Sequence, residues 1–351
     1  MAFRETMYEL LGRDSFAGDG TSEIPTLARD EARRIVIYVS RETVAPFINR
    51  SETPDETVTL MLDDGTEIIE VPARKFKSKE KLLGIRLCKL YNAIDPDYEY
   101  NDIKKPEYLK NPVSVLFGDT VVESGKGNQA MFPSRVLYSS SYSIRSKITL
   151  TKKLTHNALS SLGTMWDRSN RTFRQSLFNT EYVIPGTVFP SFVVLKDPTP
   201  EILYLVLRTL RETSYGAQTS ITGPNFSNKV FAILATKVEP PVTSFTVSVA
   251  LRKELNLGNE NVDSSITTQQ LSDKAKSYVV NEFEAHTRNF GGKLLHGETL
   301  EPLLKNINSL TGDEVENIFS ILKRDAEALW EFSGFEKKKR SDSGRKEKMS
   351  S

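Results

Sequence analysis

The segment that most constrains the fold is a helix whose apolar residues face in nearly every direction. Residues 198–213 read "PTPEILYLVLRTLRET", with Thr199 placed as the N-cap and Pro200 at the first helical position. The apolar residues are Ile202, Leu203, Leu205, Val206, Leu207 and Leu210. A helix that is apolar all round has to be buried, so other elements must cover it.

Runs typical of β-strands surround this helix. Residues 191–197 ("SFVVLKD") and 229–240 ("KVFAILATKVEP") flank it, and a third run covers residues 33–47. Residues 57–72 predict a hairpin that turns at Asp63-Asp64-Gly65. Residues 134–154 fit one or two strands, and residues 244–255 also alternate like a strand. Residues 113–118 fit either a buried strand or a helical turn.

Two other parts of the chain have helical periodicity. Apolar residues between positions 82 and 94 predict a helix with Ser78 as its N-cap, and a helical region begins near Gln269. Strands and helices interleave early and helices dominate late, which indicates an α+β fold with an antiparallel sheet. We expect a flexible lead-in over residues 1–32, a core over 33–255, a helical region over 256–336 and a disordered charged tail over 337–351.

The composition restricts the class of protein. A hydrophobic content of 38% and a charged content of 26% are typical of soluble globular proteins. No apolar run approaches the roughly 20 residues of a membrane span. The first residues lack the features of a signal peptide. The single cysteine, Cys88, excludes an internal disulfide and a cysteine-rich zinc site. We expect a cytoplasmic protein that does not enter a membrane.

Charge is unevenly distributed along a chain whose net charge is only +1. Residues 126–175 hold nine Lys or Arg and one acid, Asp167, and residues 75–89 hold Glu80 as their only acid. Residues 258–336 instead hold 14 acids and seven Lys or Arg. Such sorting favours a basic surface that binds an anionic partner, although a merely solvated face is the alternative.

The segment "SYGAQTSITGPN", residues 214–225, follows the buried helix and precedes a strand. Gly216 can end the helix in a left-handed conformation, which is the simplest explanation of that glycine. The remaining small hydroxyl and amide residues allow backbone N–H groups to form an anion-binding concavity. The lysine and spacing of a Walker loop are absent.

The stretch between residues 155 and 185 has no clean helical or strand period. It is polar and basic, and Trp166, Phe173 and Phe178 are spaced along it. A segment of this length without secondary structure is unusual in a compact domain. It is therefore either disordered or a functional projection.

Four motifs in the same order resemble the backbone subunits of type I-D CRISPR surveillance complexes, which belong to the RAMP superfamily. The motifs are "EVPARKFKSKEKLLGIRLCKLYN", "LFGDTVVESGKGNQAMFPSRVLYSSSYSI", "SLGTMWDRSNRTFRQ…VIPGTVFP" and "SFVVLKDPTPEILYLVLRTLRETSYGAQTSITG". The resemblance covers roughly residues 35–251. It implies a modified ferredoxin-like (RRM-like) core with an inserted β-hairpin thumb at about residues 155–185.

The resemblance also implies a function. Several copies would stack head to tail along a guide crRNA and present it to a target DNA strand. Other partners would be the large subunit and the subunit that caps the crRNA 5′ end. No cofactor or metal is expected, because "KPEYLKNP" stands where some relatives have paired cysteines. Ile221 replaces a basic residue that the family loop often carries, so backbone N–H groups and hydroxyls would make the phosphate contact there.

The resemblance and the basic segments together give the candidate site residues. The expected RNA-binding residues are Arg74, Lys75, Lys77, Lys79, Arg135, Arg145, Lys147, Gly216, Gln218, Thr219, Ser220, Thr222 and Gly223. The expected thumb residues are Met165, Trp166, Arg168, Arg171, Phe173 and Arg174. This division suits a protein that holds the RNA backbone and leaves the bases free to pair.

Two other functions remain open. A metal-dependent nuclease would cut the bound strand, with Asp167 or His156 as catalytic candidates and a divalent metal as cofactor. His286 and His296 lie in the acidic helical region and fit ordinary partly buried residues. The second alternative is a stand-alone protein that binds single-stranded RNA. The sequence favours a structural RNA-binding subunit over an enzyme.

Overall fold

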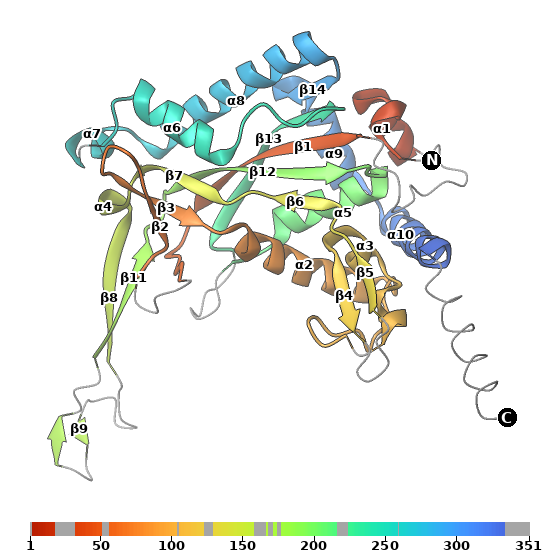
Figure 1. Ribbon diagram of the computed structural model, residues 1–351, viewed down its shortest axis with the longest axis horizontal. Helices are drawn as coiled ribbons and strands as arrows, with labels where there is room; N and C mark the ends of the chain where they lie inside the picture. The colour runs from red at the N-terminus through yellow and green to blue at the C-terminus, as the bar shows by residue number, and fades with distance from the viewer. Residues whose placement is uncertain are drawn as a thin grey trace.

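The computed structural model describes residues 2–17, 32–50, 56–103, 105–122, 129–157, 166–167, 171–173, 177–215, 224–258 and 260–333. Five strands form the main sheet, and every neighbouring pair in it is antiparallel. The order is β14-β13-β1-β12-β6, and Figure 1 shows it edge on across the middle of the molecule. The bounds are β1 Arg34–Thr43, β6 Val136–Tyr138, β12 Val188–Lys196, β13 Phe226–Thr236 and β14 Lys293–His296.

Strand β1 lies at the centre of the sheet because apolar residues alternate onto both of its faces. Its Ile37 lies opposite Val193 of β12 and Ile233 of β13. Ile37 contributes to the core under helices α2 (Ala73–Leu90) and α5 (Pro200–Glu212). Tyr38 points the other way, into the core under α6 (Ser244–Glu254) and α8 (Thr268–Phe290). The molecule therefore has three layers, with helices on both sides of the sheet (Figure 1).

Helix α5 confirms the predicted buried helix with Thr199 as its N-cap. Thr199 caps it by accepting a hydrogen bond from the Ile202 amide at 3.3 Å. Leu203, Leu205 and Val206 are fully buried. The helix packs between the sheet and neighbouring helices, so its apolar residues are covered on several sides. The predicted α+β class with an antiparallel sheet is thus confirmed.

Helix α2 begins five residues before Ser78, the predicted N-cap. Pro72 takes the N-cap position, and Ser78 lies inside the helix with its hydroxyl donating to the Lys75 carbonyl at 3.4 Å. The helix starts early because Phe76 packs edge-on against Tyr215 in the core, at 5.1 Å between ring centroids. That long-range contact cannot be read from local capping preferences.

The prediction of a strand over residues 244–255 is wrong, because this segment forms helix α6. Thr243 caps it in a reciprocal pair with Thr246, which supplies two hydrogen bonds at the helix start. Val247 and Leu251 are buried four residues apart against the sheet. Tertiary packing of that face outweighs the strand preference of the β-branched residues.

The ends of the described chain complete the core. Residues 2–11, expected in a flexible lead-in, form helix α1 (Ala2–Leu11), whose Phe3, Met7 and Leu11 are buried at helical spacing. The predicted C-terminal helical region contains the helices α7 (Glu260–Ser265), α9 (Glu301–Ser309) and α10 (Gly312–Ser333) besides α8. It also supplies β14, which pairs with β13, so the region is integrated into the main sheet.

Smaller elements project from the sheet on the side of α2. Figure 1 shows the hairpin β8–β11 on one side and the pair β4–β5 on the other. The remaining bounds are β2 Thr59–Met61, β3 Glu67–Val71, η2 Pro106–Leu109, α3 Pro112–Phe117, β4 Asp119–Val122, β5 Gln129–Phe132, β7 Ser141–Ser146, α4 Lys147–Leu150, β8 Thr151–Asn157, β9 Trp166–Asp167, β10 Thr172–Phe173 and β11 Leu177–Val183. The predicted hairpin turn lies between β2 and β3, where Gly65 has φ +78°. Within the described ranges, no helix is long and apolar enough to cross a membrane.

Candidate nucleic-acid interface

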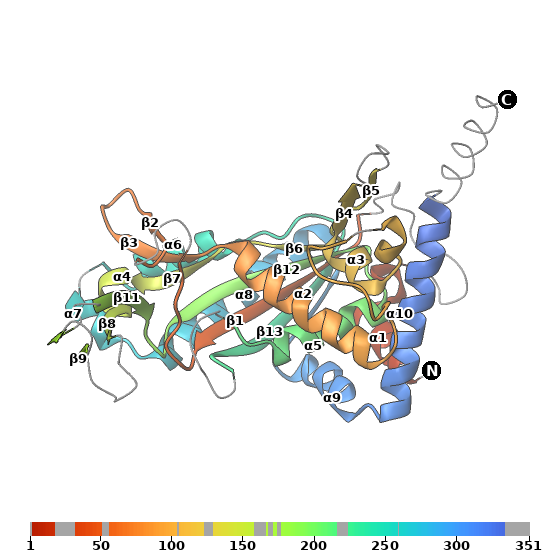
Figure 2. The same cartoon turned by 90° about the horizontal axis from the view of Figure 1, so that it is seen from below.

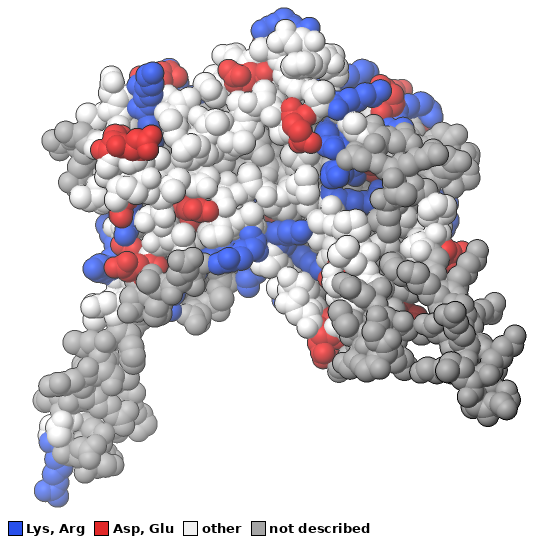
Figure 3. Space-filling model, viewed as in Figure 1, with Lys and Arg blue, Asp and Glu red and all other residues white. Residues whose placement is uncertain are grey.

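The surface between hairpin β8–β11 and pair β4–β5 is hollowed, and we call it the concave face. Figure 3 shows the hollow, with Lys and Arg side chains gathered along its roof. Helix α2 lies at the same place below the sheet in Figure 1, and it crosses in front of the strands when the molecule is seen from below (Figure 2). The basic helix predicted from the sequence therefore lies on the concave face.

The cations of α2 differ in how the protein holds them. The Lys75 ammonium donates to Asn49 Oδ1 at 3.0 Å and to the Arg50 carbonyl, and the Lys77 ammonium donates to Ser134 Oγ at 2.9 Å. Burial, with a smaller contribution from Arg74, lowers the pKa of Lys75 to about 8. Burial also lowers the pKa of Lys77. These two lysines are partly withdrawn from solvent and held in fixed positions.

Two other cations on α2 make no polar contact within the described part of the chain. They are Lys79, which was predicted, and Arg86, which the sequence reasoning missed although it lies in the same basic run. Seven residues are about two helical turns, so both lie on one side of α2, about 10 Å apart along its axis. Arg86 is exposed and Lys79 is half-buried. They are available to bind phosphates.

A buried ion pair fixes α2 against strand β1. Arg41 of β1 and Glu80 of α2 lie 2.9 Å apart, and neither side chain has any solvent exposure. The Arg41 guanidinium also lies 4.1 Å from the centroid of the Phe76 ring. In the sequence, Glu80 stands out only as the single acid of a basic run. Its isolation there was the signal for an internal partner.

The same carboxylate binds the residue that precedes the glycine loop. The Tyr215 hydroxyl donates to Glu80 Oε1 at 2.6 Å, and Arg41 Nη1 donates to that hydroxyl at 2.6 Å. Burial raises the pKa of Tyr215 well above its usual value, so the phenol stays protonated and remains a donor. Asn225, which follows the loop, accepts from the Tyr215 amide at 2.8 Å. The two ends of the loop therefore lie next to each other and next to α2.

The loop residues themselves lie outside the described part of the chain. They include the candidates Gly216, Gln218, Thr219, Ser220, Thr222 and Gly223. Their contacts stay a prediction. What the structure places is the pair of flanking residues, Tyr215 and Asn225, beside the N-terminal half of the basic helix.

Three other candidate cations are engaged within the protein. Arg135 is 8% exposed, and burial lowers its pKa although Asp197 favours its charged form. The Arg145 guanidinium donates to the Ile266 carbonyl, next to α8 on the opposite side of the sheet. The Lys147 ammonium lies 3.7 Å from a Glu181 carboxylate oxygen at the base of hairpin β8–β11. These residues have structural partners, as Lys75 and Lys77 do, so the phosphate contacts are assigned first to Lys79 and Arg86 of α2.

Hairpin β8–β11 lies in the stretch where the resemblance implied a thumb, and its identity as a thumb stays a prediction. Its strands pair from Thr151↔Val183 to Asn157↔Leu177, and Phe47 forms an isolated bridge with Val183 at its base. Lys152 and Lys153 on β8 are exposed and form no polar contact with any described residue. Sequence reasoning did not single them out, although the run "TKKL" has the exposed lysines of a solvent-facing strand.

The tip of the projection includes the short pair β9–β10. Trp166 lies opposite Phe173 in it, and Asp167 lies opposite Thr172. The Trp166 side chain is 37% exposed, and Arg171 is exposed with φ +51°. The side chains of Phe173, Asp167 and His156 and the whole residues Met165, Arg168 and Arg174 lie outside what the structure describes.

Two described side chains of types that can act in catalysis, His286 and Asp119, are held by partners within the protein. No group of three or more His, Cys, Asp or Glu residues that could hold a metal is found in the described part of the chain. His286 is buried beside Thr236, at 3.0 Å from its hydroxyl, and burial lowers its pKa. Asp119 accepts hydrogen bonds from Tyr98 and Ser114 and pairs with Lys81 at 2.5 Å, which makes it structural.

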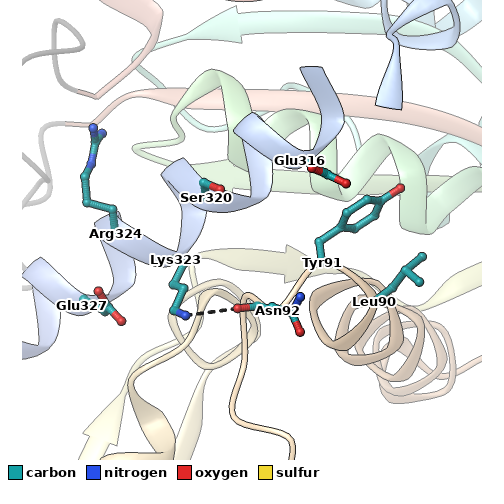
Figure 4. Close-up of a pocket in the computed structure, with 8 residues that line it drawn as sticks. All are labelled: Leu90, Tyr91, Asn92, Glu316, Ser320, Lys323, Arg324 and Glu327. Atoms are coloured by element: carbon teal, nitrogen blue, oxygen red, sulfur yellow. Dashed lines mark hydrogen bonds between the residues drawn. The ribbon is translucent and has the colours of Figure 1, made fainter. Parts of the chain in front are cut away.

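A separate groove lies where the end of α2 meets α10 (Figure 4). It has a volume of about 450 Å³, and the Lys323 ammonium crosses it to donate to the Asn92 carbonyl at 3.2 Å. Its lining combines Glu316 and Glu327 with Lys323 and Arg324. This balance of charge does not continue the cationic surface of α2, so the groove is not assigned to RNA.

The fold and the concave face define an α+β protein with a basic helix between two projections. The sequence model of the Csc2 CRISPR family matches residues 66–319. The match covers more than half of the chain, and the chain therefore belongs to the Csc2 family. The predicted resemblance to a CRISPR family is confirmed at that level. A search of curated proteins found no match.

One solved structure agrees with the family assignment at the level of the fold. The crystal structure of Thermofilum pendens Csc2 superposes with a TM-score of 0.56 at 16% identity, covering 93% of this chain and 98% of that one. A chain of a CRISPR RNA-guided surveillance complex, pre-nicking, gives a TM-score of 0.47 at 10% identity, covering 74% of this chain and 90% of that one. At 16% identity, the likeness to the Thermofilum pendens structure concerns the fold alone.

Proposed function

We propose that this protein is a backbone subunit of a type I-D CRISPR surveillance (Cascade) complex and that it holds guide crRNA on its concave face. The observation that carries the proposal is the placement of Lys79 and Arg86, two cations without a described partner, on one side of α2. Membership of the Csc2 CRISPR family supports the assignment to a guide-RNA complex.

The ferredoxin-like (RRM-like) core is part of this proposal. Strands β1, β6, β12 and β13 have the spatial order β13-β1-β12-β6, and α2 and α5 connect them on one face. In chain order this is strand–helix–strand–strand–helix–strand, which supports the ferredoxin-like description. The hairpin β8–β11 is inserted between the second and third of these strands.

The concave face suits binding that is independent of RNA sequence. A guide can have any sequence, so the protein must bind phosphate and sugar and leave the bases free to pair. Lysine and arginine side chains on a helix supply point contacts to successive phosphates. The exposed Lys152 and Lys153 would continue these contacts onto the hairpin, and Trp166 at its tip would act as the apolar wedge.

Assembly along the guide is the second part of the proposal. Several copies would repeat head to tail, because a heterologous contact that does not close produces a filament. The acidic C-terminal half and the basic middle of the chain provide opposite charges for neighbouring copies. A target DNA strand, the large subunit and the 5′-end-cap subunit would be the further partners of a cytoplasmic complex.

Co-expression with a guide RNA tests the proposal. The full chain is purified, and the length of the nucleic acid that co-purifies is measured. We expect RNA of one defined guide length, and we expect the triple change of Lys75, Lys77 and Lys79 to Glu to abolish its recovery. The matched control changes three exposed cations of the C-terminal helices to Glu, namely Lys274, Arg288 and Lys305.

The outcomes are distinguishable. Loss of guide RNA in the α2 variant alone supports the assignment of the concave face. Equal recovery from both variants contradicts it. Short RNA of random length bound to a monomer would instead identify a stand-alone single-strand binder.

A further inference from the structure

One group of buried polar residues is unusual for a protein interior and is not explained by the binding of RNA. Arg41 and Glu80 form an ion pair with no exposure at either side chain. A buried ion pair generally gains little stability over apolar residues of the same volume, because both charges lose their hydration. Arg41 Nη2 moreover has no hydrogen-bond partner among the described residues. Stability alone is a poor reason for this arrangement.

The ion pair extends to both ends of the segment between α5 and β13. Tyr215 connects to it through hydrogen bonds with Glu80 and Arg41, both of 2.6 Å. Asn225 then holds Tyr215 through two contacts, accepting from its amide and donating to its carbonyl. We call Arg41, Glu80, Tyr215 and Asn225 the brace. It links β1, α2 and the residues on each side of the glycine loop.

The brace also restrains the rotation of α2, because Glu80 belongs to that helix. Glu80 points into the core between Lys79, which makes no described contact, and Lys81, which pairs with Asp119 at 2.5 Å. A helix held by a buried side chain on one side cannot rotate about its axis. At 3.6 residues per turn, Lys79 and Arg86 lie about 100–120° around the helix axis from Glu80, so fixing Glu80 presents both cations in one direction.

We propose that the brace is a positioning device that holds the α2 cations and both ends of the glycine loop in the arrangement that binds RNA phosphates. This inference rests on the proposed function, and its residues do not themselves contact RNA. Binding groups that are fixed in advance lose less conformational entropy when the ligand arrives. Releasing one end of the loop from α2 therefore weakens RNA binding without removing any contact to RNA.

The test compares two tyrosines that bind the same carboxylate. Tyr215 donates to Glu80 Oε1 at 2.6 Å, and Tyr138 of β6 donates to Glu80 Oε2 at 2.5 Å. Tyr215→Phe releases the loop end, whereas Tyr138→Phe removes an equivalent hydrogen bond far along the chain from the loop. Binding of labelled single-stranded RNA of mixed sequence is measured at a temperature where circular dichroism shows each variant folded.

We expect Tyr215→Phe to raise the dissociation constant about tenfold, and Tyr138→Phe to change it less than about twofold at a similar loss of thermal stability. Asn225→Ala gives a second variant that leaves the ion pair intact, and it should weaken binding as Tyr215→Phe does. Equal effects of Tyr215→Phe and Tyr138→Phe would show a merely structural role. Unchanged binding in both loop-end variants would also overturn the proposal.

A third arm separates this inference from the proposed function. The double change Lys79→Gln and Arg86→Gln removes the two α2 cations that have no described partner and leaves the brace unchanged. Weakened binding by that variant together with unchanged binding by Tyr215→Phe and Asn225→Ala rejects the brace alone. Unchanged binding by the Gln variant rejects the proposed function of α2 itself.

Discussion

The most informative perturbation is the double change Lys79→Gln and Arg86→Gln. Both side chains lie on one side of α2 and make no polar contact with described residues, so their removal leaves the internal hydrogen bonds in place. They lie about 10 Å apart along the helix axis, which allows them to bind different phosphates. We expect the variant to remain folded and to lose two phosphate contacts.

The magnitude follows from the release of counterions. Each phosphate contact with a single strand contributes about −0.7 to the slope of log K against log salt concentration, so two contacts contribute about −1.4. With equal affinities extrapolated to 1 M salt, the variant should bind about 25-fold more weakly at about 0.1 M salt. The assay is fluorescence anisotropy with labelled single-stranded RNA, repeated over a series of salt concentrations.

A matched control changes Lys274 and Arg288 of α8 to Gln. These exposed cations lie on the helix that covers the opposite face of the sheet. Changing both to Gln removes the same net charge as the double change on α2. A general effect of net charge would alter both double variants equally. If the α2 variant keeps the slope of the unchanged protein, the assignment of α2 to the RNA backbone is refuted.

Three further outcomes follow from the structure. Because the pKa of Lys75 is lowered to about 8, its side chain loses its charge as pH rises through 8. RNA affinity in the same anisotropy assay should therefore fall between about pH 7 and 9. Lys75→Arg, whose side chain stays protonated, should flatten that profile. Glu80→Ala leaves the buried Arg41 guanidinium without its carboxylate and should lower the free energy of unfolding, measured by urea titration, by about 3–5 kcal/mol. Glu301→Ala, which removes an exposed acid, should change the free energy of unfolding by less than about 0.5 kcal/mol. Complementary single-stranded RNA and DNA should remain intact on the assembled protein with and without divalent metal, and regularly spaced cuts that disappear in Asp167→Ala would instead identify a nuclease.

The pH dependence of stability has the opposite sign to that of RNA binding. In the unfolded chain the lysine pKa is near its ordinary value of 10.5, and in the folded chain burial lowers the pKa of Lys75 to about 8. Between these values the unfolded state binds more protons, so the contribution of Lys75 to stability rises as pH rises through this window. Weaker RNA binding above pH 8 therefore does not reflect unfolding through this residue.

Local sequence patterns predicted the elements whose own residues determine them. Helix α5 was predictable because its apolar residues and Thr199 cap lie within one segment. Strands β1, β12 and β13 were predictable from their β-branched runs. Helix α6 was not, because its β-branched residues favour a strand locally and only the burial of Val247 and Leu251 against the sheet selects the helix.

In the candidate site, too, local sequence predicts some features and tertiary contacts determine the others. The basic run of α2 could be found from charge alone, but which cations are available depends on distant partners. Lys75 contacts Asn49 and Arg50, and Arg145 contacts Ile266, so sequence separation hides both contacts. The brace joins positions 41, 80, 215 and 225, which only the folded chain brings together.

Cross-linking tests most directly whether RNA binds the concave face. Single-stranded RNA with photoreactive uridines is cross-linked to the full chain, and the modified peptides are identified by mass spectrometry. We expect cross-links in α2, in residues 214–225 and along β8 and β11. Cross-links confined to α8, α9 and α10, with none on the concave face, would contradict this expectation.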